Sequence, residues 1–198
     1  KASLFGKAAR YAYETYQLTP VFVSIERRLD PAAGRLAVQN LEDVPYYFLD
    51  DAGRAGTIIG ALSRMKIVVS MRLHALIFAA GQGIPLAGVV YDPKVSAFLR
   101  YIGQENFTDL DALTEENLKA MIDLAAAQAD NPAAQAAAVE RLQQMERRNA
   151  DTARLLFSRE KKGTKKELYL SFGVLVSPGP TYQPLNFIDI TGGIYYEM

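Results

Sequence analysis

Short apolar segments alternate with helical segments along the first half of the chain, and this alternation limits the folds that the chain can adopt. Four segments are continuously apolar and rich in β-branched or aromatic residues, which is typical of parallel strands covered on both faces. They lie at residues 20–25, 46–49, 67–70 and 86–91. Helices are expected at residues 3–17, 36–41, 57–65, 73–82 and 93–102, and a loop at residues 27–35. The pattern predicts an α/β fold, with a Rossmann-like parallel sheet flanked by helices.

The pattern changes beyond the last of these helices. Thr114 and the two glutamates after it predict the start of a helix that reaches residue 129, and a longer, alanine-rich helix is expected over residues 131–157. A basic stretch at residues 161–166 then marks a boundary. We predict a Rossmann-like domain over residues 1–160 and a tail of unclear origin over residues 161–198. Within the tail, the apolar residues 168–176 are a candidate for an extra strand.

The composition excludes several classes of site. The 198 residues include 22 basic and 22 acidic side chains, so the net charge gives no general attraction for nucleic acid. Cysteine is absent, which excludes disulfides, thiolate metal sites and cysteine nucleophiles. The acidic pairs at residues 50–51 and 115–116 lack a third ligand at a suitable spacing, so we expect no metal site. No apolar run approaches the roughly 18 residues of a membrane span.

The clearest candidate site lies where the third expected strand meets its helix. The β-branched run at residues 67–69 ends at Ser70, and helical spacing begins at Leu73, so Arg72 and His74 fall at the first turn of the helix. This end of a helix favours anions. An arginine binds carboxylate or phosphate with two parallel hydrogen bonds, and His74, the only histidine, can transfer a proton near neutral pH. The junction therefore predicts a site for an anionic ligand.

Other polar residues are expected at the same edge of the sheet. Ligands of open parallel sheets lie beyond the carboxyl ends of the strands, where Ser70, Arg72, His74, Asp92 and Lys94 would gather. Four of them also have a structural interpretation. Ser70 and Asp92 are natural helix caps, Arg72 could pair with a carboxylate such as that of Asp92, and His74 could be a packed core residue. The loop at residues 53–56 could contact phosphate, although a plain loop is the simpler interpretation.

Three pieces of this region resemble the bacterial polysaccharide pyruvyl transferases, most closely those that act on secondary cell-wall polymers. They are Ser-Met-Arg-Leu-His-Ala-Leu-Ile-Phe-Ala at residues 70–79, Gly-Ile-Pro at 83–85, and Tyr-Asp-Pro-Lys-Val at 91–95, followed by Phe98 and Leu99. The resemblance runs from the first helix to about residue 157. It implies transfer of a pyruvyl group from phosphoenolpyruvate onto two hydroxyls of one sugar, as a ketal. It also implies that Arg72 and His74 are catalytic or bind phosphoenolpyruvate.

The resemblance carries further expectations about partners and location. The family fold resembles the two-domain glycosyltransferases of the B type, and this chain would correspond to the C-terminal half alone. Because the chain begins at Lys1 without a signal pattern, we expect it to begin inside a longer protein. The resemblance to a two-domain family implies that the chain needs an N-terminal domain and is inactive by itself. The expected partners are phosphoenolpyruvate, an amino-sugar-containing cell-wall glycan or its lipid-linked precursor, and a second copy in a homodimer. No cofactor beyond the donor and no nucleic acid is expected. The expected location is cytoplasmic, including the inner face of the membrane.

Two other functions fit the same residues. A glycosyltransferase of the same architecture would use this helix end to bind the diphosphate of a nucleotide sugar. Alternatively, the chain is a catalytically inactive fragment or an interaction domain that folds without turnover.

Overall fold

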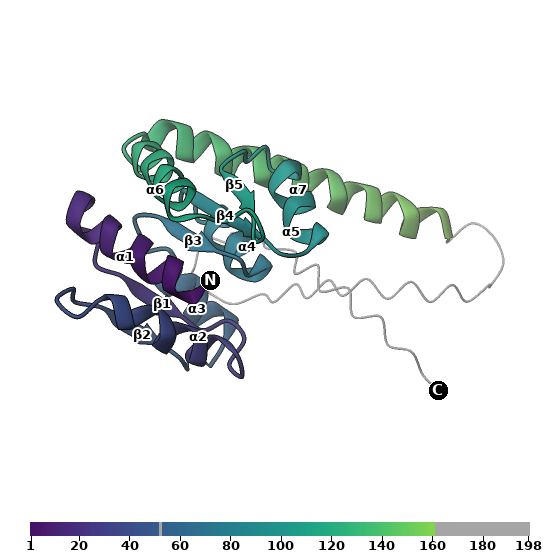
Figure 1. Cartoon of the computed structure of the whole chain (residues 1–198). Helices are drawn as coiled ribbons and strands as arrows, with labels where there is room; N and C mark the ends of the chain where they lie inside the picture. The colour runs from purple at the N-terminus through teal and green to yellow at the C-terminus, as the bar shows by residue number, and fades with distance from the viewer. Residues whose placement is uncertain (52, 161–198) are drawn as a thin grey trace. The chain divides into compact units, whose positions relative to one another are not determined.

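The computed structural model describes residues 1–51 and 53–160 (Figure 1). Its contacts divide the chain into two compact units, Lys1–Glu140 and Arg141–Met198. The strands of the described part all lie in the first unit. The candidate strand at residues 168–176 and the rest of the expected tail lie outside the described residues, so the division predicted at residue 160 stays a prediction.

Strands and helices alternate through the first unit, as expected for the α/β class. The strands are β1 (Val21–Val23), β2 (Tyr47–Leu49), β3 (Val68–Ser70), β4 (Leu86–Val90) and β5 (Phe107–Asp109). The helices are α1 (Ala2–Tyr16), α2 (Asp30–Ala37), the 3-10 helix η1 (Val38–Asn40), α3 (Ala55–Leu62), α4 (Leu73–Gly81), α5 (Pro93–Tyr101), α6 (Glu115–Ala129) and α7 (Pro132–Glu160). The four strands predicted from the sequence are all present, each within its expected range.

Every strand pairing within the described residues is parallel. One sheet has the order β1–β2, with Phe22 opposite Phe48, and the other has the order β3–β4–β5, with Gly88 beside both Ser70 and Phe107. The predicted α/β class, with parallel strands flanked by helices in a Rossmann-like arrangement, is therefore confirmed. The strands form two small sheets, where the sequence predicted a single one.

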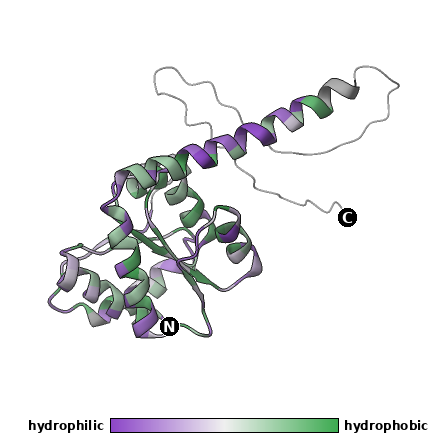
Figure 2. Ribbon diagram, turned by 90° about the horizontal axis from the view of Figure 1, so that it is seen from above, coloured by the Kyte–Doolittle hydropathy of each residue, from purple (hydrophilic) through white to green (hydrophobic). Residues whose placement is uncertain are grey.

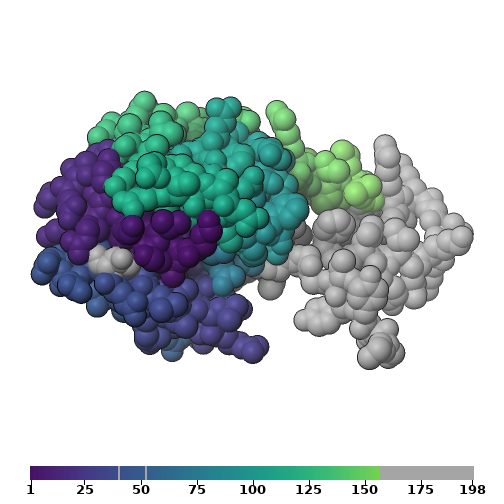
Figure 3. All heavy atoms as spheres, viewed as in Figure 1, coloured from purple at the N-terminus to yellow at the C-terminus, as the bar shows by residue number. Residues whose placement is uncertain are grey.

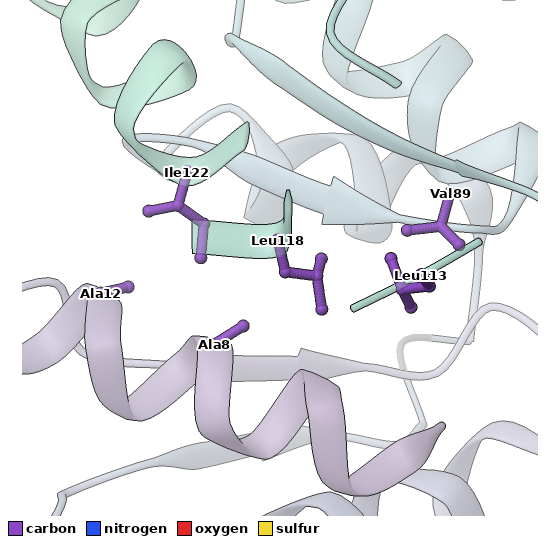
Figure 4. Packing of buried hydrophobic residues seen from close by; sticks show 6 residues of the cluster. All are labelled: Ala8, Ala12, Val89, Leu113, Leu118 and Ile122. Atoms are coloured by element: carbon purple, nitrogen blue, oxygen red, sulfur yellow. The ribbon is translucent and has the colours of Figure 1, made fainter. Parts of the chain in front are cut away.

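Helices cover both faces of the β3–β4–β5 sheet. Val89 is fully buried in a cluster with Ala8 of α1 and Leu118 and Ile122 of α6 (Figure 4). Neighbouring residues of a strand point to opposite faces. Gly88, next to Val89, faces Leu99 of α5, so α5 lies on the face opposite α1 and α6. Figure 2 shows the hydrophobic strands enclosed in the middle of this unit.

The loop expected at residues 27–35 is wrong from residue 30 onward, because α2 begins at Asp30. Pro31 suits the first turn of a helix, where its missing N–H would have no partner. Gly34 weakens the helical pattern of the sequence, but close packing explains why a glycine lies at this position. A Cβ at this position would lie 2.9 Å from Cε1 of Phe48, so the glycine lets α2 approach the β1–β2 sheet closely. The helix expected at residues 36–41 corresponds to the end of α2 together with η1.

The helices predicted after β5 are present. Thr114 caps α6 as predicted, accepting a hydrogen bond from the Asn117 N–H at 3.2 Å, and the Asn117 side chain accepts one from the Thr114 N–H at 2.9 Å. α7 begins at Pro132, one residue after the expected start. Within residues 1–51 and 53–160, no helix combines the length and the apolar character needed to cross a membrane.

Candidate functional site

The predicted junction between β3 and α4 is present, and Ser70 stabilises it locally. β3 ends at Ser70 and α4 begins at Leu73, with Arg72 in extended conformation as the N-cap. The Ser70 Oγ accepts a hydrogen bond from the Arg72 N–H at 3.0 Å. This bond closes the turn between strand and helix. Ser70 is therefore not the helix cap that the sequence allowed, because the N-cap of α4 is Arg72 and no side chain caps this helix.

Arg72 forms an ion pair with Asp30, the first residue of α2. Its Nε and Nη2 both donate to Oδ1 of Asp30, at 3.0 and 2.5 Å, and both side chains are largely buried, with 26% and 17% exposed. The hydrogen bond to Asp30 raises the pKa of the guanidinium above its ordinary value. Arg72 therefore pairs with a carboxylate, as one interpretation of the sequence allowed, but the partner is Asp30 and not Asp92.

The same Asp30 carboxylate also holds the backbone that follows β1. Its Oδ2 accepts hydrogen bonds from the N–H groups of Ile25 and Glu26, at 3.0 and 2.8 Å. One carboxylate thus connects Arg72, at the end of β3, with the loop after β1. Hydrogen bonds to an ionised acceptor are roughly twice as strong as neutral ones, so this connection fixes the loop relative to α4.

Asp92 and Lys94 lie at the end of β4, on the edge that the sequence predicted. Asp92 caps α5, with its Oδ1 accepting a hydrogen bond from the Lys94 N–H at 2.9 Å. The Lys94 Nζ lies 3.5 Å from Oδ2 of the same aspartate, and 58% of its side chain is exposed. These two residues pair with each other and are available to solvent.

His74 lies in a different part of the edge, at an open pocket of about 520 Å³. The loop after β1, the start of α3 and the start of α4 form the pocket. Its lining consists of Ser24, Ile25, Glu26, Arg27, Arg28, Gly53, Arg54, Ala55, Ile58, His74 and Phe78. The His74 ring is exposed, and its centre lies 6.2 Å from that of Phe78 on the next turn. Of the five site residues predicted from the sequence, His74 alone lines this pocket among the described residues.

The pocket is rich in basic side chains. Arg27 pairs with Asp51 at 2.6 Å. The guanidinium groups of Arg28 and Arg54 have no hydrogen-bond or ion-pair partner within residues 1–51 and 53–160. Glu26 is the only carboxylate that lines the pocket among the described residues. It accepts a hydrogen bond from the Arg28 N–H at 3.0 Å and so turns toward its own loop. This arrangement suits a small anion that lies beside a group able to transfer a proton.

The family model of the polysaccharide pyruvyl transferases matches residues 12–93. This segment belongs to the polysaccharide pyruvyl transferase family. The pyruvyl transferase segment (residues 12–93) contains every residue that lines the pocket, together with Asp30 and Arg72. The matched family consists of transferases that move pyruvyl groups in polysaccharide synthesis. No curated protein and no solved structure matches the chain.

Sequence reasoning missed part of the pocket of this pyruvyl transferase segment. The sequence does not single out Arg28, and it favours a plain loop around Arg54. A usable signal exists in both cases. Arg28 follows a predicted strand within a few residues, and Arg54 immediately precedes a helix, so both lie where parallel sheets bind ligands. Among the described residues, no group of three or more histidine, cysteine, aspartate or glutamate side chains could hold a metal ion.

Proposed function

We propose that this chain is the donor-binding part of a polysaccharide pyruvyl transferase, with phosphoenolpyruvate held beside His74. The observation that carries the proposal is the pocket inside the family-matched segment, which is lined by the only histidine of the chain and by arginines from two other loops. Phosphoenolpyruvate carries a phosphate and a carboxylate, and a basic pocket favours both. A neighbouring imidazole adds a proton-transferring group.

The proposed reaction needs both proton donation and proton removal. A proton is added to the methylene carbon of the enol, and a sugar hydroxyl attacks the adjacent carbon and loses its proton. The bond from this carbon to the phosphate oxygen then breaks, and a second hydroxyl of the same sugar attacks and loses its proton. Two hydroxyl protons are released; one balances the new methyl group and the other leaves on the phosphate. The products are a pyruvate ketal and inorganic phosphate. His74 is the side chain of this pocket suited to relay these protons.

The other predicted site residues take supporting roles in this proposal. Lys94 is an exposed cation on the same edge of the sheet, where it could meet the acceptor or the phosphate of the donor. Ser70 and Asp92 hold the two helix starts that present His74 and Lys94. A direct contact between Arg72 and the donor, which the sequence predicts, stays a prediction.

The proposal extends to the acceptor and to the rest of the enzyme. The pocket is open, as expected for a site that a second domain closes in glycosyltransferases of the B type. We therefore propose an N-terminal domain as the second wall, an amino-sugar-containing cell-wall glycan or its lipid-linked precursor as acceptor, and a cytoplasmic location, including the inner face of the membrane. A homodimer is a further proposal, which sedimentation of the purified chain tests.

A ligand-binding measurement tests the donor. Phosphoenolpyruvate should raise the melting temperature of the 198-residue chain, because a ligand that binds only the folded state stabilises it. A nucleotide sugar should leave the melting temperature unchanged. The His74→Gln variant should bind phosphoenolpyruvate more weakly. A shift with the nucleotide sugar and none with phosphoenolpyruvate would support the glycosyltransferase alternative, and no shift with either would support an inactive interaction domain.

An activity measurement tests the role of His74. In the protein as its gene encodes it, His74→Gln should lower the rate of ketal formation by about a hundredfold or more, the usual contribution of a general acid or base. Phosphate release in the presence of acceptor is the readout. Wild-type turnover in this variant would refute His74 as the proton-transferring group.

A further inference from the structure

We propose that Arg28 and Arg54 bind the two anionic groups of the donor, and that Arg72 acts as a positioning residue that holds the pocket in shape. This inference rests on the proposed function, because it identifies the side chains that recognise phosphoenolpyruvate in the pocket beside His74.

The first argument is that the guanidinium of Arg72 is already occupied. Its Nε and Nη2 both donate to Asp30, and the pair is largely buried. If a donor anion bound this guanidinium, the Asp30 carboxylate would lose its cation while remaining poorly solvated. An unpaired charge in such a position costs free energy. It would also release the carboxylate that holds the N–H groups of Ile25 and Glu26, both of which line the pocket.

The second argument is that two other arginines of the pocket are available. Arg28 follows β1 and Arg54 precedes α3, so they reach the pocket from different loops. Neither guanidinium has a partner among the described residues, whereas their neighbour Arg27 is paired with Asp51. A free guanidinium binds a carboxylate or a phosphate with two parallel hydrogen bonds. Two of them, on separate loops, match a ligand that has two anionic groups.

The third argument is the apolar side of the same pocket. Ile58 of α3 and Phe78 of α4 are half-buried and line it together with His74. Phosphoenolpyruvate has one apolar part, its methylene carbon, and this carbon is the atom that receives a proton. With the two anions on Arg28 and Arg54, the methylene group would lie against the apolar side chains and within reach of the imidazole. A pocket of about 520 Å³ leaves room for part of an acceptor sugar as well.

Donor binding to variants of the 198-residue chain tests the inference. Arg28→Gln and Arg54→Gln should each raise the dissociation constant for phosphoenolpyruvate by about tenfold to a hundredfold, as expected for a lost charged hydrogen-bonding partner. Inorganic phosphate and pyruvate, with one anionic group each, should bind wild type more weakly than phosphoenolpyruvate. Calorimetric titration is the measurement. Arg64→Gln is the matched control, because Arg64 follows the other end of α3 and lies outside the pocket.

The result that overturns the inference differs from the one that overturns the proposed function. If wild type binds phosphoenolpyruvate and the Arg28 and Arg54 variants bind it equally well, this inference is wrong and the proposed function stands. If wild type fails to bind phosphoenolpyruvate, the proposed function fails first. Circular dichroism of each variant separates weakened binding from loss of the fold.

The positioning role of Arg72 has its own readout. Asp30→Asn should weaken donor binding about as much as Arg72→Gln, and the double variant should be no weaker, because both substitutions break the same connection. Arg72→Lys keeps a positive charge toward Asp30 and should recover most of the affinity. If Arg72 bound the donor directly, Asp30→Asn would free the guanidinium, and binding would be unchanged or tighter.

Discussion

Gly88 is a residue whose missing side chain determines how closely α5 approaches the β3–β4–β5 sheet. A Cβ at Gly88 would lie 2.5 Å from Cδ1 of Leu99 and 3.2 Å from Cβ of Phe107. Both neighbours are held by packing, since Leu99 is fully buried and Phe107 lies on the adjacent strand. Gly88→Ala should therefore lower the free energy of unfolding by about 1–3 kcal/mol, the usual range for overpacking, as measured by urea denaturation.

Gly60 provides the matched control for this substitution. It lies inside α3, and a Cβ there would meet no atom within 4 Å. Gly60→Ala should therefore raise the free energy of unfolding, by about 0.5–1 kcal/mol, because alanine costs less conformational entropy in a helix. Equal effects of the two substitutions would contradict the close packing at Gly88.

Among single residues, two helix caps could be predicted from the sequence, whereas the ion-pair partner of Arg72 could not. Thr114 and Asp92 were identified as N-caps because the cap acts on the backbone two or three residues further along the chain. The partner of Arg72 was not identified, since Asp30 belongs to another element and its position depends on the whole sheet. His74 was placed correctly at the start of α4, but the sequence could not show which loops would surround it.

At the scale of elements, α1 and α6 pack side by side and are joined at their edges by polar contacts (Figure 3). The hydroxyls of Tyr11 and Tyr16 both donate to Oδ1 of Asp123, at 2.8 and 2.7 Å, and this raises the pKa of Tyr16 to about 12. At the N-terminus of α6, Glu115 forms ion pairs with Lys119 at 2.8 Å and with Lys7 of α1 at 2.9 Å.

The ion pairs of Glu115 should make the docking of α1 on α6 sensitive to acid. The hydrogen bonds from Lys119 and then Lys7 lower the pKa of this carboxyl from 4.5 to about 2. The unfolded chain therefore binds more protons between these two values. The stabilisation is present above pH 4.5 and is lost as the pH falls toward 2. Melting temperatures of wild type and Glu115→Gln should differ near neutral pH and converge across this window.

Glu116 is the control for this pH dependence. It carries the same charge on the same turn of α6, but it has no salt bridge within the described residues. Glu116→Gln should change the melting temperature less than Glu115→Gln and should not remove the acid sensitivity. A similar pH profile for both variants would indicate an effect of the helix dipole alone.

Elements with a clear hydrophobic period were predicted well, and the two misses have local causes. α2 was interpreted as a loop because Asp30, Pro31 and Gly34 are typical loop residues. β5 was missed because it has only three residues and includes Thr108 and the exposed Asp109. What holds β5 is the pairing with β4, together with Asn106 just before it. The buried Asn106 amide donates to the carbonyls of Leu86 and Met121, and such contacts depend on the assembled fold.

At the scale of the whole first unit, the ion pair of Asp30 and Arg72 connects α2, which packs on the β1–β2 sheet, with the end of β3 in the other sheet. Asp30→Asn and Arg72→Gln should each lower the free energy of unfolding by about 1–3 kcal/mol, and a double-mutant cycle should give a coupling of about 0.5–3 kcal/mol. The measurement is urea denaturation of the four proteins.

An exposed ion pair of the same chain serves as the control. Lys66 and Asp130 lie 2.8 Å apart, but their side chains are 49% and 76% exposed, so their coupling should be close to zero. A coupling of similar size for both pairs would show that the pair of Asp30 and Arg72 is no stronger than a surface contact.

The pocket is the feature that the sequence predicts least well. Arg28, Arg54 and His74 come from three separate strand–helix connections. Each connection could be located from the sequence, because strands and helices alternate clearly. Which of them meet in space depends on strand order and on the tilt of α3 and α4, and neither is encoded in local spacing.

The contacts of Asp30 also make the pocket loop observable without any ligand. The N–H groups of Ile25 and Glu26 lie near the surface, yet both donate to the carboxylate that Arg72 holds. Amide hydrogens in a loop ordinarily exchange with solvent quickly, whereas these two should exchange slowly as long as the carboxylate stays fixed. In Arg72→Gln the carboxylate keeps its charge but loses its anchor. The exchange rates of these two amides therefore measure how firmly the donor pocket is held in shape before any substrate arrives.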